Sequence, residues 1–490
     1  MAEKGDQRRL LAKLEPYGQQ HLLQFWEELS RAEQIRLAGQ IEALDLEQIA
    51  ALFRGECDQP DWAELSRGAG PPPAIRLADR RSGTGGSPGI SRRAAHDRGE
   101  HALRTGNIAV LLTAGGQGSR LGFDLPKALF PIGPISGASL LQIHIEKVRA
   151  LGNRYGNSVP LYLMTSPATH EETVRYLASS DNFGLAEEDL FVFCQGTMPA
   201  VDARSGKLLL AQKHELWLSP DGHGGTVAAL RACGALEHIR KRGVGHLFYL
   251  QVDNPLAPIC DCELLGFHLL AESQLTSIAV AKGQPHDKLG NFVTVDGALY
   301  VIEYSDFPDD VAQLRDDSGA LRFWAGSIAV HVFDLSLLER AADATDGLPF
   351  HSARKKVPAI NQARHSPPPG ERARGDRAGE LYPLEQTDAL KFERFIFDLL
   401  PIAERPMVVE FPEEECFAPL KNAPGATKDT AAYVQELMFA QYGRWLEAAG
   451  ARVAAGVNVE LSPLYALDAA GVAERVSASQ SFSKSQYLRD

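Results

Sequence analysis

The chain has 490 residues and a mass of 53.3 kDa, several times the size of a typical domain, which excludes a peptide-sized binding module. Apolar residues at 44% and charged residues at 23% are ordinary globular values and exclude a largely disordered or fibrous chain. The net charge of -13 has the wrong sign for a protein whose main partner is nucleic acid. We therefore expect any bound nucleotide to be small.

The apolar runs and the cysteines of the sequence indicate the cellular compartment in which the protein works. No run of about 18 apolar residues is present, and the first residues, MAEKGDQRRLLAKLEP, lack the apolar segment of a signal peptide. Six scattered cysteines are too few for a disulfide framework. The close pair Cys260 and Cys262 lacks a second pair at zinc spacing, so we expect no metal there. These features predict a cytoplasmic protein without a membrane partner.

Two segments precede the first predicted strand. Residues 1–55 carry Leu, Ala, Glu and Gln at helical spacing and predict a helical region, with Ser30 and Glu33 forming a capping box. Residues 68–99 are rich in Gly, Pro, Ser and Arg. Their poor apolar periodicity predicts an extended or mobile connector without helices or strands.

From Asn107 onward, short apolar runs alternate with helical stretches. The predicted strands are 108–112, 160–164 and 247–252, and the first predicted helix is 139–151. Such alternation predicts an α/β fold, a doubly wound and mostly parallel sheet with helices on both faces and ligands at the carboxyl ends of its strands.

The remaining segments complete the predicted organisation. Residues 365–380 predict a solvated loop, and a helix over 427–449 precedes short strands. We divide the chain into an N-terminal region with its connector (1–104), a central α/β domain (105–422) and a small C-terminal domain (423–490).

The densest chemical signal is LTAGGQGSRLG, directly after the strand predicted at 108–112. Gly115, Gly116 and Gly118 let backbone amides close on an oxyanion without a Cβ in the way. Arg120 adds a guanidinium fork for phosphate oxygens, and Lys127 adds an ammonium that could stabilise charge on a reacting phosphate. This pattern predicts a phosphate cradle.

Three other interpretations compete for these glycines. A P-loop needs Gly-Lys-Ser/Thr after GxxxxG, and no such triplet follows. A dinucleotide fold needs GxGxxG and an acid at the end of the second strand, but the third glycine is displaced to Gly122 and the second strand ends in Met-Thr-Ser. A turn that merely packs strand against helix explains two of the glycines but not four together with Arg120 and Lys127.

The string GGQGSRLG followed by PK resembles the nucleotidyltransferase signature of the eukaryotic-type UDP-sugar pyrophosphorylases, most of all the UDP-N-acetylhexosamine enzymes and their bacterial relatives. The similarity covers roughly residues 107–422, with a weaker echo at Glu460–Leu464. Further family landmarks follow in order, at Gln195–Ala200, Ser219–Gly225, Gln251–Asn254, Val301–Ser305, Ala325–Ser327, Lys355–Pro358, Lys391–Asp398 and Phe417–Asn422.

This resemblance implies a reaction in which UTP and a sugar 1-phosphate give a UDP-sugar and pyrophosphate. The loop amides and Arg120 would hold the triphosphate, and Lys127 and Lys421 would stabilise the charge of the transition state. Asp253, at the end of a strand, would suit Mg²⁺, although an aspartate there also fits a turn cap. Either lysine also fits an ordinary surface position. UTP and the sugar phosphate are the expected partners, and the oligomeric state stays open.

The resemblance also assigns base and sugar contacts. Gln195, with the backbone of Gly222, would read uracil, although such an amide also fits a loop tie. Positions that contact the hexose in this family are Gly290, Glu303, the segment ending in Ser327, and His223. Phe395 and Phe397 would line the apolar side of an N-acetyl group, while their alternation fits equally a strand with one buried face.

Three departures from the eukaryotic pattern concern the substrate. His223 and Ser327 stand where the N-acetylhexosamine enzymes carry Asn, and Ala128 follows Lys127 where they carry Gly. His223 predicts a pH-sensitive activity near neutrality. N-acetylglucosamine 1-phosphate is the leading substrate. A UDP-glucose or broad-specificity UDP-sugar pyrophosphorylase, a non-catalytic nucleotide-sugar binding homologue and, more distantly, a retaining glycosyltransferase are the alternatives.

Overall fold

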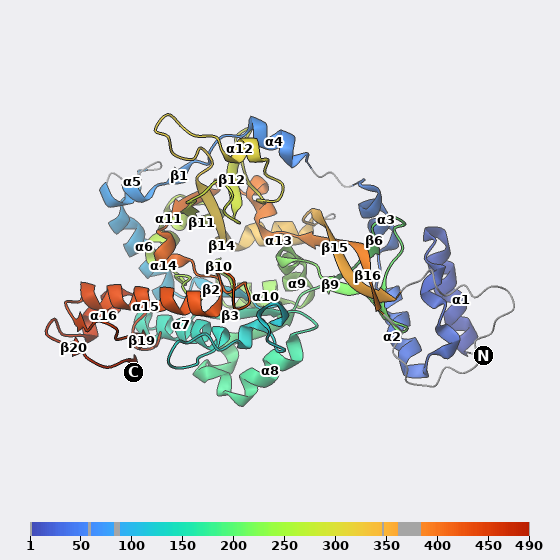
Figure 1. Ribbon diagram of the computed structural model, residues 1–490, viewed down its shortest axis with the longest axis horizontal. Helices are drawn as coiled ribbons and strands as arrows, with labels where there is room; N and C mark the ends of the chain where they lie inside the picture. The colour runs from blue at the N-terminus through green and yellow to red at the C-terminus, as the bar shows by residue number, and fades with distance from the viewer. Residues whose placement is uncertain (1, 57–59, 83–88, 345–346, 361–383, 490) are drawn as a thin grey trace. The chain divides into compact units, whose positions relative to one another are not determined.

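The computed structural model describes residues 2–56, 60–82, 89–344, 347–360 and 384–489 (Figure 1). The chain forms two compact units. We call residues 1–59, 196–225 and 348–395 the small unit, and residues 60–195, 226–347 and 396–490 the large unit. No helix in the described part of the chain is long and apolar enough to cross a membrane.

The small unit combines three N-terminal helices with short strands and one long hairpin. Its helices are α1 (Ala2–Leu14), α2 (Arg31–Glu42) and α3 (Leu46–Arg54). Its strands are β5 (Thr197–Pro199), β6 (Val201–Asp202), β7 (Leu210–Gln212), β8 (Glu215–Leu216), β9 (Leu218–Pro220), β15 (Phe350–Ile360) and β16 (Leu384–Arg394). The predicted helical region is confirmed, and Ser30 and Glu33 form the predicted capping box at the start of α2.

A core of the small unit buries leucines of the helices, such as Leu14 and Leu37, against Val201, Phe350 and Phe392. The β15–β16 hairpin pairs antiparallel along its whole length, and β6 adds to its edge. The predicted loop 365–380 between these strands lies outside the described residues.

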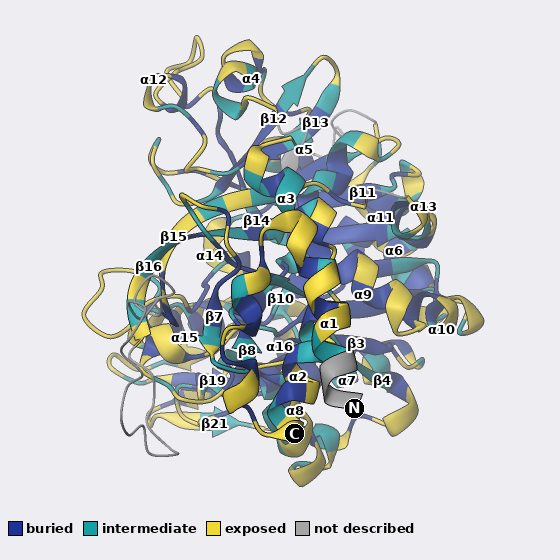
Figure 2. Ribbon diagram, turned by 90° about the vertical axis from the view of Figure 1, so that its right-hand side faces the viewer, coloured by how far each residue is buried: buried dark blue, intermediate teal, exposed yellow. Residues whose placement is uncertain are grey.

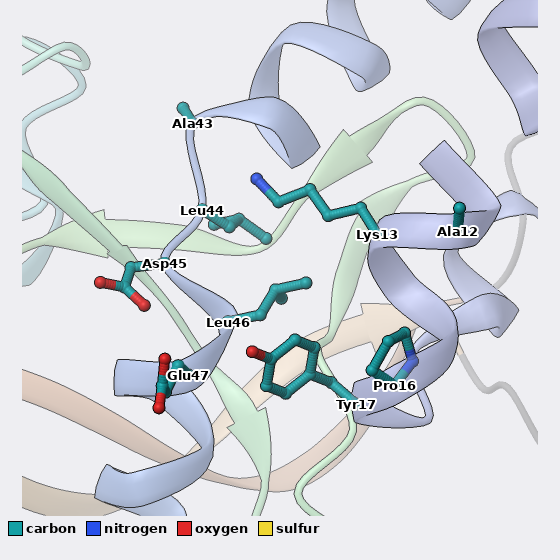
Figure 3. A pocket seen from close by; sticks show the side chains of 9 residues that line it. All are labelled: Ala12, Lys13, Pro16, Tyr17, Ala43, Leu44, Asp45, Leu46 and Glu47. Atoms are coloured by element: carbon teal, nitrogen blue, oxygen red, sulfur yellow. The ribbon is translucent and has the colours of Figure 1, made fainter. Parts of the chain in front are cut away.

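A surface pocket of about 580 Å³ lies in the small unit (Figure 3). It is lined by residues of α1, of the turn after it, of the connection between α2 and α3, and of the first turn of α3. Figure 3 shows Lys13 extending from α1 toward that connection, where its amine donates to the carbonyl of Glu42. No predicted site residue lines this pocket.

The large unit holds a ten-stranded mixed sheet. Along its main path the order is β1 (Ala74–Ile75), β17 (Met407–Glu410), β11 (Leu275–Ala281), β14 (Ala325–Asp334), β10 (His246–Gln251), β2 (Ile108–Thr113), β3 (Leu161–Thr165) and β4 (Leu190–Cys194). The hairpin of β12 (Gly290–Val295) and β13 (Ala298–Ile302) pairs with the start of β14. β14 runs antiparallel to β10 and β11, whereas the other pairs on the path are parallel.

The predicted α/β architecture with a mostly parallel sheet is therefore confirmed. Every residue of β2 and β3 is buried, as expected for central parallel strands, and Figure 2 shows the central strands mostly dark blue. The predicted first helix is α7 (Leu140–Tyr155), which Ser139 caps by accepting from the amide of Gln142. Gly156, with φ of 71°, ends α7.

The other helices of the large unit connect or cover its strands. They are α4 (Trp62–Gly68), α5 (Leu77–Ser82), α6 (Arg92–Arg104), α8 (His170–Ser179), α9 (Thr226–Ala232), α10 (Ala235–Lys241), α11 (Cys262–Leu270), α12 (Asp309–Ala312), α13 (Leu335–Asp343), α14 (Glu413–Cys416), α15 (Ala431–Ala448) and α16 (Ala469–Arg475). Four short strands close the chain: β18 (Arg452–Val453), β19 (Val459–Leu461), β20 (Ser481–Phe482) and β21 (Gln486–Leu488). The predicted C-terminal helix, α15, and the short strands after it are confirmed.

The prediction of a connector without helices or strands over 68–99 is wrong. This segment contains β1, which pairs with β17, then α5 and most of α6. α6 packs against α11 through small residues, because a Cβ on Gly99 would lie 2.0 Å from the carbonyl oxygen of Cys262. Arg80 and Arg92 both bind the carboxylate of Glu263. These contacts order a segment whose apolar residues are few.

Candidate functional site

The predicted nucleotide residues of the large unit lie at one edge of its sheet. Parallel strands β2, β3, β4, β10 and β11 end at the same edge, and antiparallel β14 begins there. The glycine loop follows β2, Gln195 follows β4 and Asp253 follows β10. Ser327 lies at the start of β14. The topology thus brings residues from distant parts of the chain to the place where α/β sheets bind ligands.

The glycine loop doubles back on itself. The amide of Lys127 donates to the carbonyl of Gly116 over 3.0 Å, and the amide of Gly118 donates to the carbonyl of Leu125 over 3.0 Å. A Cβ on Gly118 would lie 2.7 Å from that carbonyl oxygen, so a larger residue does not fit. No α-helix starts between Gly115 and Ser139, which excludes both the dinucleotide pattern and a strand-to-helix packing turn.

The tip of this loop presents backbone donors. Gly116 and Gln117 are exposed, and their amides donate to no acceptor within the described part of the chain. Arg120, on a short 3₁₀ turn, is exposed and forms no ion pair with any residue that the structure describes. The loop can therefore offer amides and a guanidinium to an anion.

Lys127 and Asp253 form an ion pair at the carboxyl edge. The Lys127 Nζ lies 3.3 Å from Asp253 Oδ2, and both side chains are largely buried, at 20% and 11% exposure. Burial raises the pKa of Asp253, but the charges of Lys127 and Lys421 outweigh it and hold that pKa below its usual value. The aspartate is thus ionised and bound to the lysine, which does not fit the turn-cap interpretation.

Asn254 links this pair to the segment that carries Lys421. Its side-chain amide donates to the carbonyl of Cys416 over 2.8 Å and accepts from the amide of Ala418 over 3.0 Å. The amide of Leu420 then donates to the carbonyl of Asp253 over 2.8 Å. Lys421 itself is exposed. Sequence reasoning missed this role of Asn254, because its partners lie more than 160 residues away along the chain.

Gln195 lies against the start of the glycine loop. It is buried, and a Cβ on Gly115 would lie 2.7 Å from its Oε1. Ser166, which sequence reasoning missed, donates to the carbonyl of Gly115 over 2.8 Å. The loop is therefore fixed by groups that follow β3 and β4.

A second group of predicted residues gathers around Gly290. Gly290 pairs with Ser327 across β12 and β14, and a Cβ on Gly290 would lie 3.3 Å from a carboxylate oxygen of Glu303 and 3.8 Å from Cβ of Ser327. Phe397 is buried in a 3₁₀ segment of the large unit. The nearest atom to a Cβ on Gly290 would be Cγ1 of Val301, at 2.6 Å, so Gly290 lets β12 pack closely while Glu303 and Ser327 lie beside it.

The small unit holds Gly222, His223 and Phe395. Gly222 has φ of 86°, and a Cβ there would lie 2.3 Å from the carbonyl oxygen of Arg394. Phe395 lies near two imidazoles: its ring is 5.3 Å from that of His223 and 4.4 Å from that of His351. His351 was not predicted, because a single histidine in a strand carries no distinguishing pattern.

Two expectations about these residues are wrong. Burial, aided by the nearby His351, lowers the pKa of His223 to about 4, so His223 is neutral at physiological pH and does not titrate near neutrality. Phe395 and Phe397 do not belong to one strand with a buried face, since β16 ends at Arg394 and a 3₁₀ turn begins at Ile396.

The buried carboxyl of Asp221 gives stability a pH dependence. Asp221 is 8% exposed, and burial raises its pKa to about 6 against the opposing effect of Arg394. The folded protein therefore binds more protons than the unfolded chain between about pH 4 and 6, and the contribution to stability is lost as the pH rises through this window. We expect the free energy of unfolding of Asp221→Asn, relative to that of the native protein, to increase by up to about 3 kcal/mol as the pH rises from 4 to 7.

Urea denaturation at several pH values checks this expectation. The matched control is Asp388→Asn in the same unit, because Asp388 lies at the surface and its pKa is lowered by Arg354 rather than raised by burial. Equal stability differences for Asp221→Asn at pH 4 and pH 7 would contradict the expectation.

The loop that follows Lys127 is held by the C-terminal part of the chain. The carboxylate of Glu460, on β19, accepts from the amides of Ile135 and Ser136 and from the Ser136 hydroxyl, each over 2.6 Å. The loop then closes, as the amide of Leu140 donates to the carbonyl of Phe130. The Glu460 motif seen in the sequence thus fixes the turn at residues 135–136.

The carboxyl edge of the sheet, as far as the structure describes it, offers too few carboxylates to bind a divalent cation without oxygen atoms from a substrate. Among the described residues, no group of three His, Cys, Asp or Glu side chains could hold a metal ion. Asp253 is a single ionised carboxylate beside the loop amides. Mg²⁺ commonly binds through one or two carboxylates together with substrate phosphates, and Asp253 fits that mode.

Comparisons with known proteins agree with this arrangement. A family model described as UTP–glucose-1-phosphate uridylyltransferase matches residues 91–365. UDP-N-acetylhexosamine pyrophosphorylase-like protein 1 of Xenopus tropicalis is 33% identical over 466 residues, or 92% of this chain and 86% of that protein. UDP-N-acetylglucosamine pyrophosphorylase of Saccharomyces cerevisiae is 32% identical over 462 residues, or 91% and 92%. The crystal structure of the Trypanosoma brucei uridine diphosphate N-acetylglucosamine pyrophosphorylase, in complex with an inhibitor, aligns with a TM-score of 0.78 and 26% identity over 96% of this chain and 94% of that one.

Proposed function

Because the chain belongs to the UTP–glucose-1-phosphate uridylyltransferase family, we propose that it joins UTP to N-acetylglucosamine 1-phosphate, giving UDP-N-acetylglucosamine and pyrophosphate. The observation that carries the proposal is the Lys127–Asp253 pair beside the exposed amides of the glycine loop. The family resemblance seen in the sequence is confirmed by the same matches. The relatives named for N-acetylglucosamine support the choice of sugar.

The reaction is a direct displacement at phosphorus. An oxygen of the sugar 1-phosphate attacks the α-phosphorus of UTP, the bond to the oxygen that bridges to the β-phosphorus breaks, and pyrophosphate leaves. The protein supplies position and charge rather than covalent chemistry. Lys127 and Lys421 stabilise the growing negative charge, while Arg120 and the amides of residues 115–118 hold the triphosphate.

Asp253 is the residue that would hold Mg²⁺, and the cation would neutralise charge on the triphosphate when bound. In this role the carboxylate would bind the cation, and the ammonium of Lys127, 3.3 Å from that carboxylate, would stand near the phosphates. The depressed pKa of Asp253 supports the role, because the ligand must be ionised.

Base and sugar contacts follow from the remaining predicted residues. In the large unit, Gln195, buried against Gly115, is the side chain that we propose reads the uracil edge. In the small unit, the proposed base contact is the backbone of Gly222. Sugar hydroxyls donate to Glu303, and Gly290 is the backbone contact that we propose for the sugar. The remaining sugar contacts that we propose are His223, Ser327, Phe395 and Phe397.

The proposal extends to the organisation of the chain. Residues 105–422 act as the catalytic domain, with a doubly wound sheet that the two-sided burial of β2 supports. Residues 1–104 and 423–490 form accessory regions, and Glu460 supports a positioning role for the second. We also propose that the enzyme works in the cytoplasm.

Pyrophosphate release from UTP and Mg²⁺ with a panel of sugar 1-phosphates tests the function. We expect N-acetylglucosamine 1-phosphate to give the highest kcat/KM, and chelation of Mg²⁺ to abolish turnover. A preference for glucose 1-phosphate would favour the second candidate, a UDP-glucose or broad-specificity pyrophosphorylase, which Ser327 beside Gly290 supports. Binding of UDP-sugar without any turnover would contradict the proposal and leave a non-catalytic homologue. Ala128 gives that alternative little support, because it is fully buried in the core.

A further inference from the structure

Two side chains of α7 are bonded to the backbone of the loop that carries Asp253. His144 and Lys147 stand three residues apart and therefore share a face of the helix. His144 Nε2 donates to the carbonyl of Val252 over 3.0 Å, and Lys147 Nζ donates to the carbonyls of Pro255 and Ala257 over 2.6 and 2.9 Å. The helix thus binds this loop on both sides of Asp253.

Removing these two titratable side chains from water lowers stability, so packing alone does not explain why they are there. His144 is fully buried, and burial, with a further push from Lys147, lowers its pKa to about 3, so its ring is neutral. Burial also lowers the pKa of Lys147 to about 7, and this lysine forms no ion pair within the described ranges. An apolar side chain at this half-buried position would need no hydrogen-bond partners. What the amine adds is a fixed direction for two carbonyl groups.

The loop held in this way connects the charged groups of the site. Asp253 pairs with Lys127, and the adjacent Asn254 binds the backbone at Cys416 and Ala418, which leads to Lys421. A shift of the loop would therefore displace the carboxylate and the lysine-bearing segment together. A misplacement of about 1 Å at a reacting centre can cost about a hundredfold in rate.

We propose that Lys147 is a positioning residue for uridylyl transfer, which sets the Asp253 loop by holding the carbonyls of Pro255 and Ala257, with His144 as its partner at Val252. The inference rests on the proposed function. Lys147 does not contact the substrate in this proposal. It acts only through the Asp253 loop.

The test compares Lys147→Met with Arg149→Met. Arg149 lies on the same helix and also donates to a backbone carbonyl, that of Phe183, over 2.6 Å, but Phe183 lies outside the Asp253 loop. Steady-state kinetics with UTP and N-acetylglucosamine 1-phosphate gives kcat and KM, and thermal denaturation reports stability. Backbone hydrogen exchange of residues 252–258, measured without substrate, reports the loop itself. Lys147→Gln, which keeps a donor group on a shorter side chain, serves as the conservative variant.

For Lys147→Met we expect kcat to fall at least about tenfold with less change in KM, and exchange of residues 252–258 to rise. Lys147→Gln should restore part of kcat, and Arg149→Met should lower the melting temperature while leaving kcat within about twofold. An equal loss of kcat in Arg149→Met, or unchanged kcat and exchange in Lys147→Met, would overturn the proposal. If Lys147→Met does not fold, Lys147→Gln is judged by the same comparison with Arg149→Met. If the native protein turns over no sugar 1-phosphate, the proposed function fails, while the exchange data still decide whether Lys147 holds the loop.

Discussion

Lys127→Ala is expected to lower kcat at least about tenfold, each tenfold being about 1.4 kcal/mol of barrier. By the proposed mechanism the variant loses an ammonium beside the reacting phosphate, and it also leaves the buried Asp253 without its partner. Uridine nucleotide binding should remain detectable, because the loop amides and Gln195 are untouched. Pyrophosphate release and nucleotide titration measure the two effects separately.

The matched control for this prediction is Lys241→Ala. Lys241 is a surface lysine of α10 with a side chain 71% exposed, and its only ion pair is with Glu237 one turn earlier, as far as the described residues go. The Lys241→Ala variant loses the same charge but leaves the site unchanged, so its kcat should stay within about twofold of the native value. Native turnover in Lys127→Ala would remove Lys127 from the mechanism.

Gly266→Ala is expected to destabilise the large unit by about 3 kcal/mol or more, the upper end for overpacking in a core. A Cβ at this position would lie 1.7 Å from the carbonyl oxygen of Ala95 and 2.5 Å from its Cα. These are backbone atoms of α6, so no rotation of a side chain relieves the contact. α6 and α11 would have to move apart along their shared seam. Urea denaturation measures the loss.

Gly443→Ala provides the opposite result in the same unit. Gly443 lies inside α15, and a Cβ there would meet nothing within 4 Å. Alanine has a higher helix propensity than glycine, so we expect the free energy of unfolding of this variant to rise by up to about 1 kcal/mol. Equal stability for the two variants would contradict the role that we give to the α6–α11 seam.

Local patterns in the sequence predicted the elements that local interactions determine. The strands after Asn107, the capping box at Ser30 and the helix capped by Ser139 each depend on residues within a few positions. The connector prediction failed at α6 because the buried face of this helix consists of Ala95, Gly99, Ala102 and Leu103. Small residues carry little hydrophobic signal, yet they allow the close approach to α11.

The residues of the candidate site also fall into those that local sequence patterns predict and those that only the fold shows. The glycine loop, Lys127 and Asp253 could be predicted, because their residue types and positions after strands indicate phosphate chemistry. Ser166, Asn254 and Lys147 could not, because each acts on a backbone group from another part of the chain. A hydrogen bond to a carbonyl leaves no residue-type pattern at the acceptor, so only the fold shows it.

The bond between Glu460 and residues 135–136 spans 324 to 325 positions of the sequence. A ribosome therefore completes the whole glycine loop and Lys127 long before it adds the carboxylate that fastens the following turn. A nascent or C-terminally clipped product would contain every nucleotide-contacting residue that we propose and still lack this fastening. We therefore expect a chain that ends before β19 to lose activity sharply, and a chain that ends before β21, the pairing partner of β19, to hold Glu460 less firmly.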